Sequence, residues 1–161
     1  EPLYIQRIAQ LTNKSNQFNL TTLRCSEDDI RAMAGDKNDL CLCGKLVDKF
    51  GDNGIVSAVI GRKENDALHI DLWLMSCRVL KRNMEYAMLD CLVSEAKLQG
   101  IRNIYGYYLK TKKNNMVKSL FSDFGFEKIS EDIEENTVWK MDIKNYIPKN
   151  KLIIVKQTQK V

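Results

Sequence analysis

The chain has 161 residues, of which 44% are hydrophobic and 29% charged, and this balance excludes a disordered or a membrane-spanning protein. Residues 1–100 carry 13 basic and 14 acidic side chains, whereas residues 101–161 carry 12 and 7, so an acidic or phosphorylated partner is expected near the C-terminal half. The sequence has no basic stripe with interleaved aromatic residues, so nucleic acid is the weaker choice of partner. No apolar run approaches the roughly 20 residues that span a bilayer.

The first half of the chain is expected to hold two helices followed by a meander of strands. An i, i+3, i+4 apolar stripe predicts a helix over Tyr4–Asn16. Ser26, followed by Asp29 as a capping partner, predicts a short helix over Glu27–Ala34. Three strands should follow over residues 39–50, 55–61 and 67–75, joined by polar turns at 51–54 and 63–66.

The second half is expected to alternate helices and strands. The longest helix is predicted over Asn83–Gln99 and ends at Gly100. Further elements are predicted as a strand over 101–108, a helix over 114–124 and strands over 126–129 and 137–143. Together they predict one α+β domain over residues 1–145, with a mixed, mostly antiparallel sheet. In the tail over 146–161, the apolar run Leu152–Val155 is expected to add an edge strand or to bind a partner.

The five cysteines do not form a metal or disulfide pattern. Cys41 and Cys43 are one residue closer than a C-x-x-C pair, and His69 is the only histidine. We therefore expect no metal site and reduced thiols in a cytoplasmic protein. The chain begins at Glu1 without Met, so a fragment of a longer protein or a processed chain is expected.

The segment Met75–Asn83, M-S-C-R-V-L-K-R-N, joins a predicted strand to the longest predicted helix. A helix N-terminus is a common anion-binding site, but no glycine is present here to let the backbone approach an anion closely. Cys77 is surrounded in sequence by Arg78, Lys81 and Arg82, and such cations favour the thiolate form of a cysteine. The segment therefore predicts either a nucleophilic Cys77 or a small residue packed at the end of a strand.

The order of elements resembles the GNAT N-acetyltransferase fold, and four short stretches are similar to a narrower family. Tyr4–Thr22, Phe50–Val56, Met75–Leu80 and Thr111–Asn114 resemble the C-terminal GNAT-like domain of FkbH-like proteins, and the similarity covers nearly all of residues 3–143. The resemblance implies transfer of a glyceryl-type acyl unit from a phosphorylated donor to an acyl carrier protein. It also implies an upstream haloacid-dehalogenase-type phosphatase domain as a partner, whose D-x-D motif is absent from this chain.

Compared with the motifs of GNAT enzymes, the chain keeps some positions and changes others. In the coenzyme A pyrophosphate motif, Q/R-x-x-G-x-G/A, Arg78 matches the first position, while Lys81 and Asn83 replace glycines. The resemblance implies that Asn114 hydrogen-bonds a pantetheine arm, carried either by a carrier protein or by acetyl-coenzyme A. Phe121 replaces the usual general-acid tyrosine and cannot protonate a leaving thiolate.

Other polar residues are candidates for the site. Asp71 and His69 lie two apart on one predicted strand and share its face, with Asp71 a candidate orienting carboxylate and His69 either a base or a solvent-facing edge residue. Cys77 is six residues beyond Asp71 and is expected to share this side if the strand continues. Substrate-binding candidates come from the loops after the first predicted helix and after the fourth predicted strand: Asn16, Asn19, Thr21, Thr111 and Lys113. Turn formation and helix capping explain the asparagines and threonines equally well.

Three functions remain open from the sequence. The first is acyl transfer to a carrier protein through a thioester on Cys77. The second is coenzyme A-dependent N-acetyl transfer, and the third is a non-catalytic domain that docks a carrier protein or an upstream domain.

Overall fold

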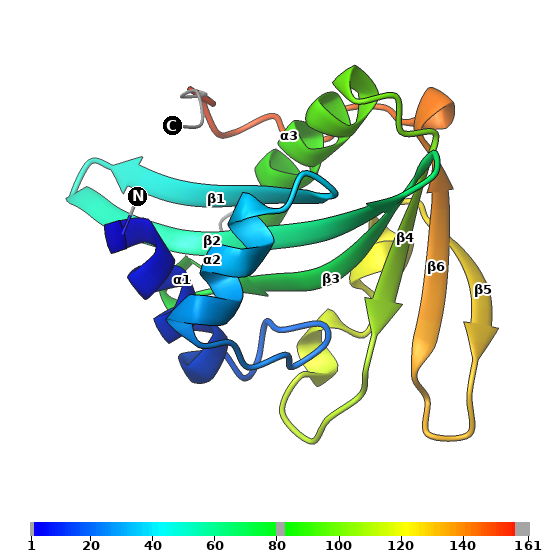
Figure 1. Cartoon of the computed structure of the whole chain (residues 1–161), viewed down its shortest axis with the longest axis horizontal. Coiled ribbons are helices and arrows are strands. Elements are labelled where there is room, and N and C mark those ends of the chain that lie inside the picture. Colours follow the sequence, from blue (N-terminus) through cyan, green and yellow to red (C-terminus); the bar gives the residue numbers. More distant parts are fainter. Residues whose placement is uncertain (1, 80–82, 157–161) are drawn as a thin grey trace.

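The computed structural model describes residues 2–79 and 83–156, and in this part of the chain Figure 1 shows a six-stranded sheet with helices on both faces. The strand order is β1-β2-β3-β4-β6-β5, in which only β3 and β4 pair in parallel. The strands are β1 (Asp39–Asp48), β2 (Gly51–Glu64), β3 (Ala67–Met75), β4 (Asn103–Tyr108), β5 (Glu127–Glu131) and β6 (Thr137–Asp142). The helices are α1 (Pro2–Lys14), α2 (Glu27–Gly35), α3 (Met84–Leu98) and α4 (Leu120–Asp123), with short 3-10 turns η1 (Cys77–Val79), η2 (Asn115–Val117) and η3 (Ile143–Asn145).

The predicted elements are present with several of their ends shifted by a few residues, and three differences are larger. The turn expected at 51–54 is wrong, because the chain reverses at Lys49 and Phe50, where the Asp48 carboxylate accepts a hydrogen bond from the Phe50 amide. The helix expected over 114–124 divides into η2 and α4, neither of which has a side-chain N-cap. The tail residues Leu152–Val155 form no strand.

Two hydrophobic cores lie on opposite faces of the sheet. One packs α1 and α2 against β2 and β3, and the other packs α3 and α4 against every strand except β5. β3 contributes buried side chains to both cores. Its register against β2 passes from Ile70–Gly61 to Leu72–Ile60, which leaves Asp71 as an extra residue. Such a bulge reverses the alternation of side chains along the strand. Ile70 and Trp73 consequently lie in the same core, on the α3 face.

β3 and β4 pair only over their first residues and then diverge. Phe18–Leu20, which follows α1, fills the gap as an extra piece of extended chain. The Met75 amide donates to the Phe18 carbonyl at 3.1 Å, the Leu20 amide to the Trp73 carbonyl at 3.2 Å, and the Leu109 amide to the Leu20 carbonyl at 2.8 Å. This wedge, Phe18–Leu20, is almost completely buried and satisfies main-chain groups that the divergence would leave unpaired.

On the α3 face, the gap between β3 and β4 is filled by aromatic side chains. Trp73 packs on Phe121 and Phe124, and a Cβ at Gly106 would lie 2.4 Å from the Phe121 ring. We expect Gly106→Ala to lower the free energy of unfolding by about 1–3 kcal/mol, because a methyl group overpacks a closed core. Urea denaturation measures the change. Gly35→Ala is the control, since its added Cβ meets nothing within 4 Å, and an equal loss in both variants would contradict the packing explanation.

The C-terminal tail folds back over α3 instead of pairing with the sheet. Asp90 on α3 accepts hydrogen bonds from the Tyr146 hydroxyl, from the Lys149 amide at 3.0 Å and from the Asn150 amide at 2.9 Å. Burial, reinforced by the bond to Asp90, raises the pKa of Tyr146, which therefore stays a donor. A single carboxylate thus fixes the path of the tail.

Asp90→Ala should release the tail from α3. Because bonds to a carboxylate are stronger than neutral ones, the Lys149 and Asn150 amides should exchange with deuterium at least about tenfold faster. Hydrogen-exchange mass spectrometry of the peptide spanning 146–156 measures this rate. Asp123→Ala on α4 is the matched control, and unchanged exchange in Asp90→Ala would show that other contacts hold the tail.

Candidate functional site

An open groove of about 1030 Å³ lies where α1, the end of β3 and the loop after β4 meet. Its floor is apolar, formed by Leu11, Phe18 and Met75. Its walls are lined by cationic side chains, by polar side chains and by the Cys77 thiol: Arg7, Lys14, Ser15, Asn16, Gln17, Ser76, Cys77, Lys112 and Lys113. The groove therefore joins a thiol to an apolar floor and a basic rim.

Helical spacing places one side of α1 along the groove. Arg7, Leu11 and Lys14 are separated by four and three residues, so they lie on one helix face. The end of α1 is fixed by Arg24, whose guanidinium donates to the carbonyls of Thr12 and, at 3.1 Å, Ser15. These bonds satisfy the carbonyls that a helix C-terminus leaves unpaired.

Cys77 is an exposed thiol on a fixed stretch of backbone. The Ser76 amide donates to the Val56 carbonyl at 2.7 Å, and η1 begins at Cys77. Cys25 differs, because burial, reinforced by nearby Asp29, raises its pKa and keeps it a protonated core residue. Cys77 is therefore accessible to a ligand in the groove, whereas the Cys25 side chain is buried.

The charged side chains that line the groove are all basic: Arg7, Lys14, Lys112 and Lys113. No ion pair is recorded for the three lysines in the described residues 2–79 and 83–156. Nearby Lys110, in contrast, is paired with Glu135. The groove thus favours an anionic ligand.

Two of the predicted substrate-binding residues lie in this groove with Cys77. Asn16 accepts a hydrogen bond from Arg24 Nη2 at 2.6 Å through its side-chain oxygen, which orients the amide. Lys113 comes from the loop after β4, and Thr111 Oγ1 accepts from its amide at 3.2 Å. Cys77 and Lys113, which follow Asn16 by 61 and 97 residues in the sequence, therefore line the same groove as Asn16.

The remaining candidates in these loops make internal contacts. Asn19 is fully buried, Thr21 Oγ1 donates to the Asp71 carbonyl at 2.8 Å, and Thr111 Oγ1 accepts from the amides of Lys113 and Asn114. Asn114 is also fully buried. Its oxygen accepts from the Thr111 amide at 2.8 Å and the Tyr108 hydroxyl at 3.1 Å, and its nitrogen donates to the Asn19 carbonyl at 3.0 Å and the Leu109 carbonyl at 2.9 Å. For all four residues, the expected contacts with a ligand remain predictions.

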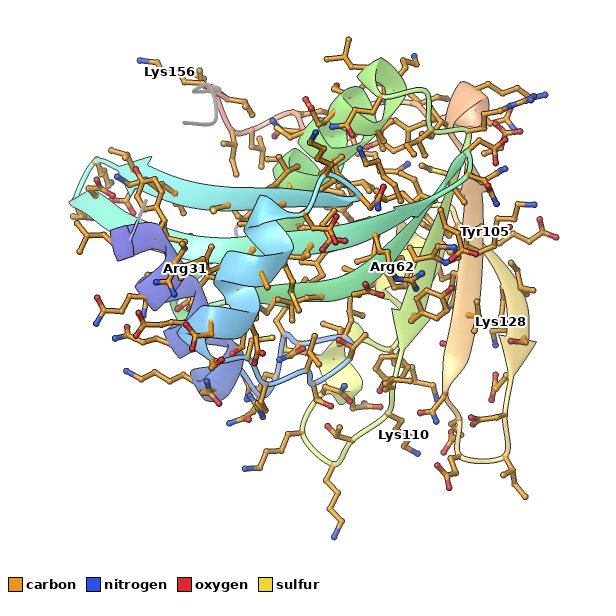
Figure 2. The ribbon with its side chains drawn as sticks, in the orientation of Figure 1. Arg31, Arg62, Tyr105, Lys110, Lys128 and Lys156 are labelled. Carbon is orange, nitrogen blue, oxygen red and sulfur yellow. The ribbon has the colours of Figure 1, made fainter. Side chains whose placement is uncertain are left out.

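Asp71 and His69 lie away from the groove, on the sheet face that α1 and α2 leave uncovered. Figure 2 shows Arg62 and Tyr105 on this face. Asp71 pairs with Arg62 at 3.4 Å, and His69 Nδ1 is 2.6 Å from the Tyr107 hydroxyl and its ring stacks on Tyr105. The edge position expected for His69 is wrong, because β3 is a central strand, but its half-buried side chain does lie on this uncovered face. The Asp71 bulge also breaks the alternation from which Asp71 and Cys77 were expected to share a side.

The predicted phosphate-binding residues lie at or next to a gap in the described chain. Lys81 and Arg82 fall outside the described residues, as does the side chain of Arg78. Asn83 precedes α3 in the left-handed conformation, with φ 64°, and makes no side-chain cap. Asparagine tolerates this conformation better than most residues, so Asn83 starts the helix where a glycine would serve equally well.

The sequence did not single out Arg7 and Lys14 as groove residues. Arg7 and Lys14 are two turns apart in α1, and this spacing was the available signal. A second cavity of about 420 Å³ lies between the tail, β6 and the turn after α4, and its rim carries both acidic and basic side chains. In the part of the chain that the structure covers, no group of three or more His, Cys, Asp or Glu side chains could hold a metal ion, and no helix could cross a membrane.

No family model and no curated protein matches this sequence. Solved structures do match. The Escherichia coli ribosomal-protein-S18-alanine N-acetyltransferase has a TM-score of 0.66 at 11% identity, over 96% of each chain. A GNAT-family acetyltransferase from Desulfovibrio desulfuricans has a TM-score of 0.65 at 9% identity, over 89% of this chain and 92% of its own. A Mycobacterium tuberculosis protein in complex with coenzyme A has a TM-score of 0.66 at 12% identity, over 88% of this chain and 95% of its own. The α+β chain described here has the GNAT acetyltransferase fold.

Proposed function

We propose that this domain transfers an acyl group through a thioester on Cys77, from an anionic acyl donor to the phosphopantetheine thiol of an acyl carrier protein. A glyceryl-type acyl unit, and an upstream phosphatase-like domain as partner, fit the resemblance to FkbH-like proteins. The observation that carries the proposal is the accessible thiol of Cys77 in a groove whose charged lining is entirely basic.

The proposed reaction has two acyl-transfer steps at the same carbonyl carbon. The Cys77 thiolate attacks the acyl carbon of an acyl phosphate, the carbon–oxygen bond to phosphate breaks, and phosphate leaves with the electron pair. The pantetheine thiolate then attacks the thioester, and Cys77 leaves as thiolate. The basic rim favours the anionic donor and the leaving phosphate in the first step.

Two features of the fold favour a donor that approaches along the groove. The gap between β3 and β4 is filled on one face by the Phe18–Leu20 wedge and on the other by Trp73, Phe121 and Phe124. A long arm entering between these strands would have to displace buried groups, while Cys77 is reached directly from the groove.

Intact mass spectrometry tests the proposal. The protein is incubated with a three-carbon acyl phosphate, alone and with a carrier protein that bears phosphopantetheine. The expected result is an acyl adduct that maps to Cys77, is removed by hydroxylamine and moves to the carrier. Absence of an adduct on both Cys77 and the carrier would overturn the proposal.

Coenzyme A-dependent N-acetyl transfer is the second candidate, and the fold shared with an acetyltransferase and with a coenzyme A complex favours it. Phe121 opposes it, since this residue is buried and has no hydroxyl to protonate a leaving thiolate. Calorimetric titration with acetyl-coenzyme A separates the candidates. Saturable binding with acetylation of an amine would favour the second, whereas no binding is expected from the first.

A further inference from the structure

The pairing of the Phe18–Leu20 wedge with β3 brings Asn16 close to Cys77. The wedge runs antiparallel to the end of β3, with Asn19 opposite Leu74. In an antiparallel pair, each residue back along one chain matches a residue forward along the other. Three residues back from Asn19 is Asn16, and three residues on from Leu74 is Cys77. Both residues line the groove, as this register predicts.

The side-chain amide of Asn16 has a defined orientation. Arg24 Nη2 lies 2.6 Å from the amide, and because a guanidinium only donates hydrogen bonds, the amide atom next to it is the oxygen. The amide nitrogen therefore points away from Arg24. Within the part of the chain that the structure describes, no hydrogen bond is recorded for this nitrogen. Its two hydrogens are available to a ligand in the groove.

Arg24 is itself held by the end of α1. Its Nη1 donates to the carbonyls of Thr12 and, at 3.1 Å, Ser15. The amide of the next residue, Cys25, donates to Thr12 Oγ1 at 3.0 Å and ties this stretch of backbone to the helix. A donor that is already in place stabilises a developing charge without having to reorganise. Arg24 thus gives the Asn16 amide the fixed position that such a donor requires.

We propose that the amide nitrogen of Asn16 donates a hydrogen bond to the acyl oxygen while the Cys77 thiolate attacks, and that Arg24 is the positioning residue. Attack forms the carbon–sulfur bond and moves the π electrons of the carbonyl onto its oxygen, whose negative charge the Asn16 N–H stabilises. The carbonyl then re-forms, and the leaving group departs with its electron pair. The inference rests on the proposed function and adds a catalytic contact for Asn16.

The test compares two reactions of the Cys77 sulfur, of which only one forms an oxyanion. The reagent p-nitrophenyl acetate acylates a thiolate through a tetrahedral intermediate and releases p-nitrophenolate. Iodoacetamide alkylates the same thiolate by direct displacement of iodide. Peptide mapping by mass spectrometry measures both rates at Cys77. Both reactions need the thiolate, so the ratio of acylation to alkylation is independent of any change in the pKa of Cys77.

Asn16→Asp keeps an acceptor for Arg24 but has no hydrogen to donate, so it should lower this ratio at least about tenfold. Asn16→Ala removes the donor without adding a charge and should lower the ratio to a similar extent. Arg24→Gln leaves the donor present but no longer held, so its effect should be smaller. Gln17→Glu is the matched control, because this neighbour also lines the groove and gains the same charge, and it should leave the ratio unchanged.

Asn16 is only partly buried, so its variants should fold normally, and urea denaturation checks this. An unchanged ratio in both Asn16 variants, or an equal fall in Gln17→Glu, would overturn the inference. A Cys77 that reacts with neither reagent would overturn the proposed function as well. Absence of transfer from an acyl phosphate to a carrier, with the ratio still lowered in the Asn16 variants, would instead contradict the proposed function alone.

Discussion

Replacing Cys77 with alanine should abolish the covalent acyl adduct and lower acyl transfer to the carrier protein by at least about a thousandfold. Removing a nucleophile eliminates the two-step route, and what remains is the slow direct reaction between donor and pantetheine thiol. Intact mass spectrometry measures the adduct, and the rate at which the carrier gains mass measures transfer. Folding of the variant is expected to be unchanged, since the Cys77 side chain is exposed.

Cys43→Ala is the matched control for Cys77→Ala. Cys43 is also an exposed cysteine, but it lies on β1 and does not line the groove. It should keep the adduct and the transfer rate within a factor of two. Full transfer by Cys77→Ala would instead support a domain that binds the carrier without chemistry of its own.

The elements predicted best from sequence carried local signals. The Ala67–Met75 strand has the predicted bounds because its apolar run lies between a polar turn and a polar loop. α2 begins where Ser26 and Asp29 form a reciprocal capping box. Gly51–Gly54 was misassigned because both glycines have positive φ, at 128° and 71°, inside irregular pairing of β1 and β2. Glycine composition alone does not distinguish a bulged strand from a turn.

The candidate site depended more on tertiary structure. Cys77, Asn16 and Lys113 were singled out separately, and only the fold shows that they line one groove. Asp71 was grouped with Cys77 on the assumption of a regular strand, and one extra residue in β3 invalidates that assumption. Lys14 gave no signal by itself, because a lysine on a helix is usually solvated and its role depends on what faces it.

The second large effect is expected from substitution of Asn114. A structural role of its buried amide and a role in ligand binding predict different results. Asn114→Ala should lower the free energy of unfolding by about 3 kcal/mol or more, measured by urea denaturation. The substitution leaves the carbonyls of Asn19 and Leu109, the Thr111 amide and the Tyr108 hydroxyl without these partners. Burial raises the pKa of Tyr108, so its hydroxyl stays protonated and needs an acceptor.

Asn114→Asp separates the two explanations further. A carboxylate keeps the two acceptor bonds but faces the carbonyls of Asn19 and Leu109 without a hydrogen to donate, so it should destabilise the domain at least as much as alanine. Asn115→Ala, next to it and exposed, should change stability by less than about 0.5 kcal/mol. Near-normal stability of both Asn114 variants, together with weakened carrier binding, would contradict the structural role of Asn114 and support a role in ligand binding. The amide would then contact the pantetheine arm, and the Phe18–Leu20 wedge would have to move to admit it.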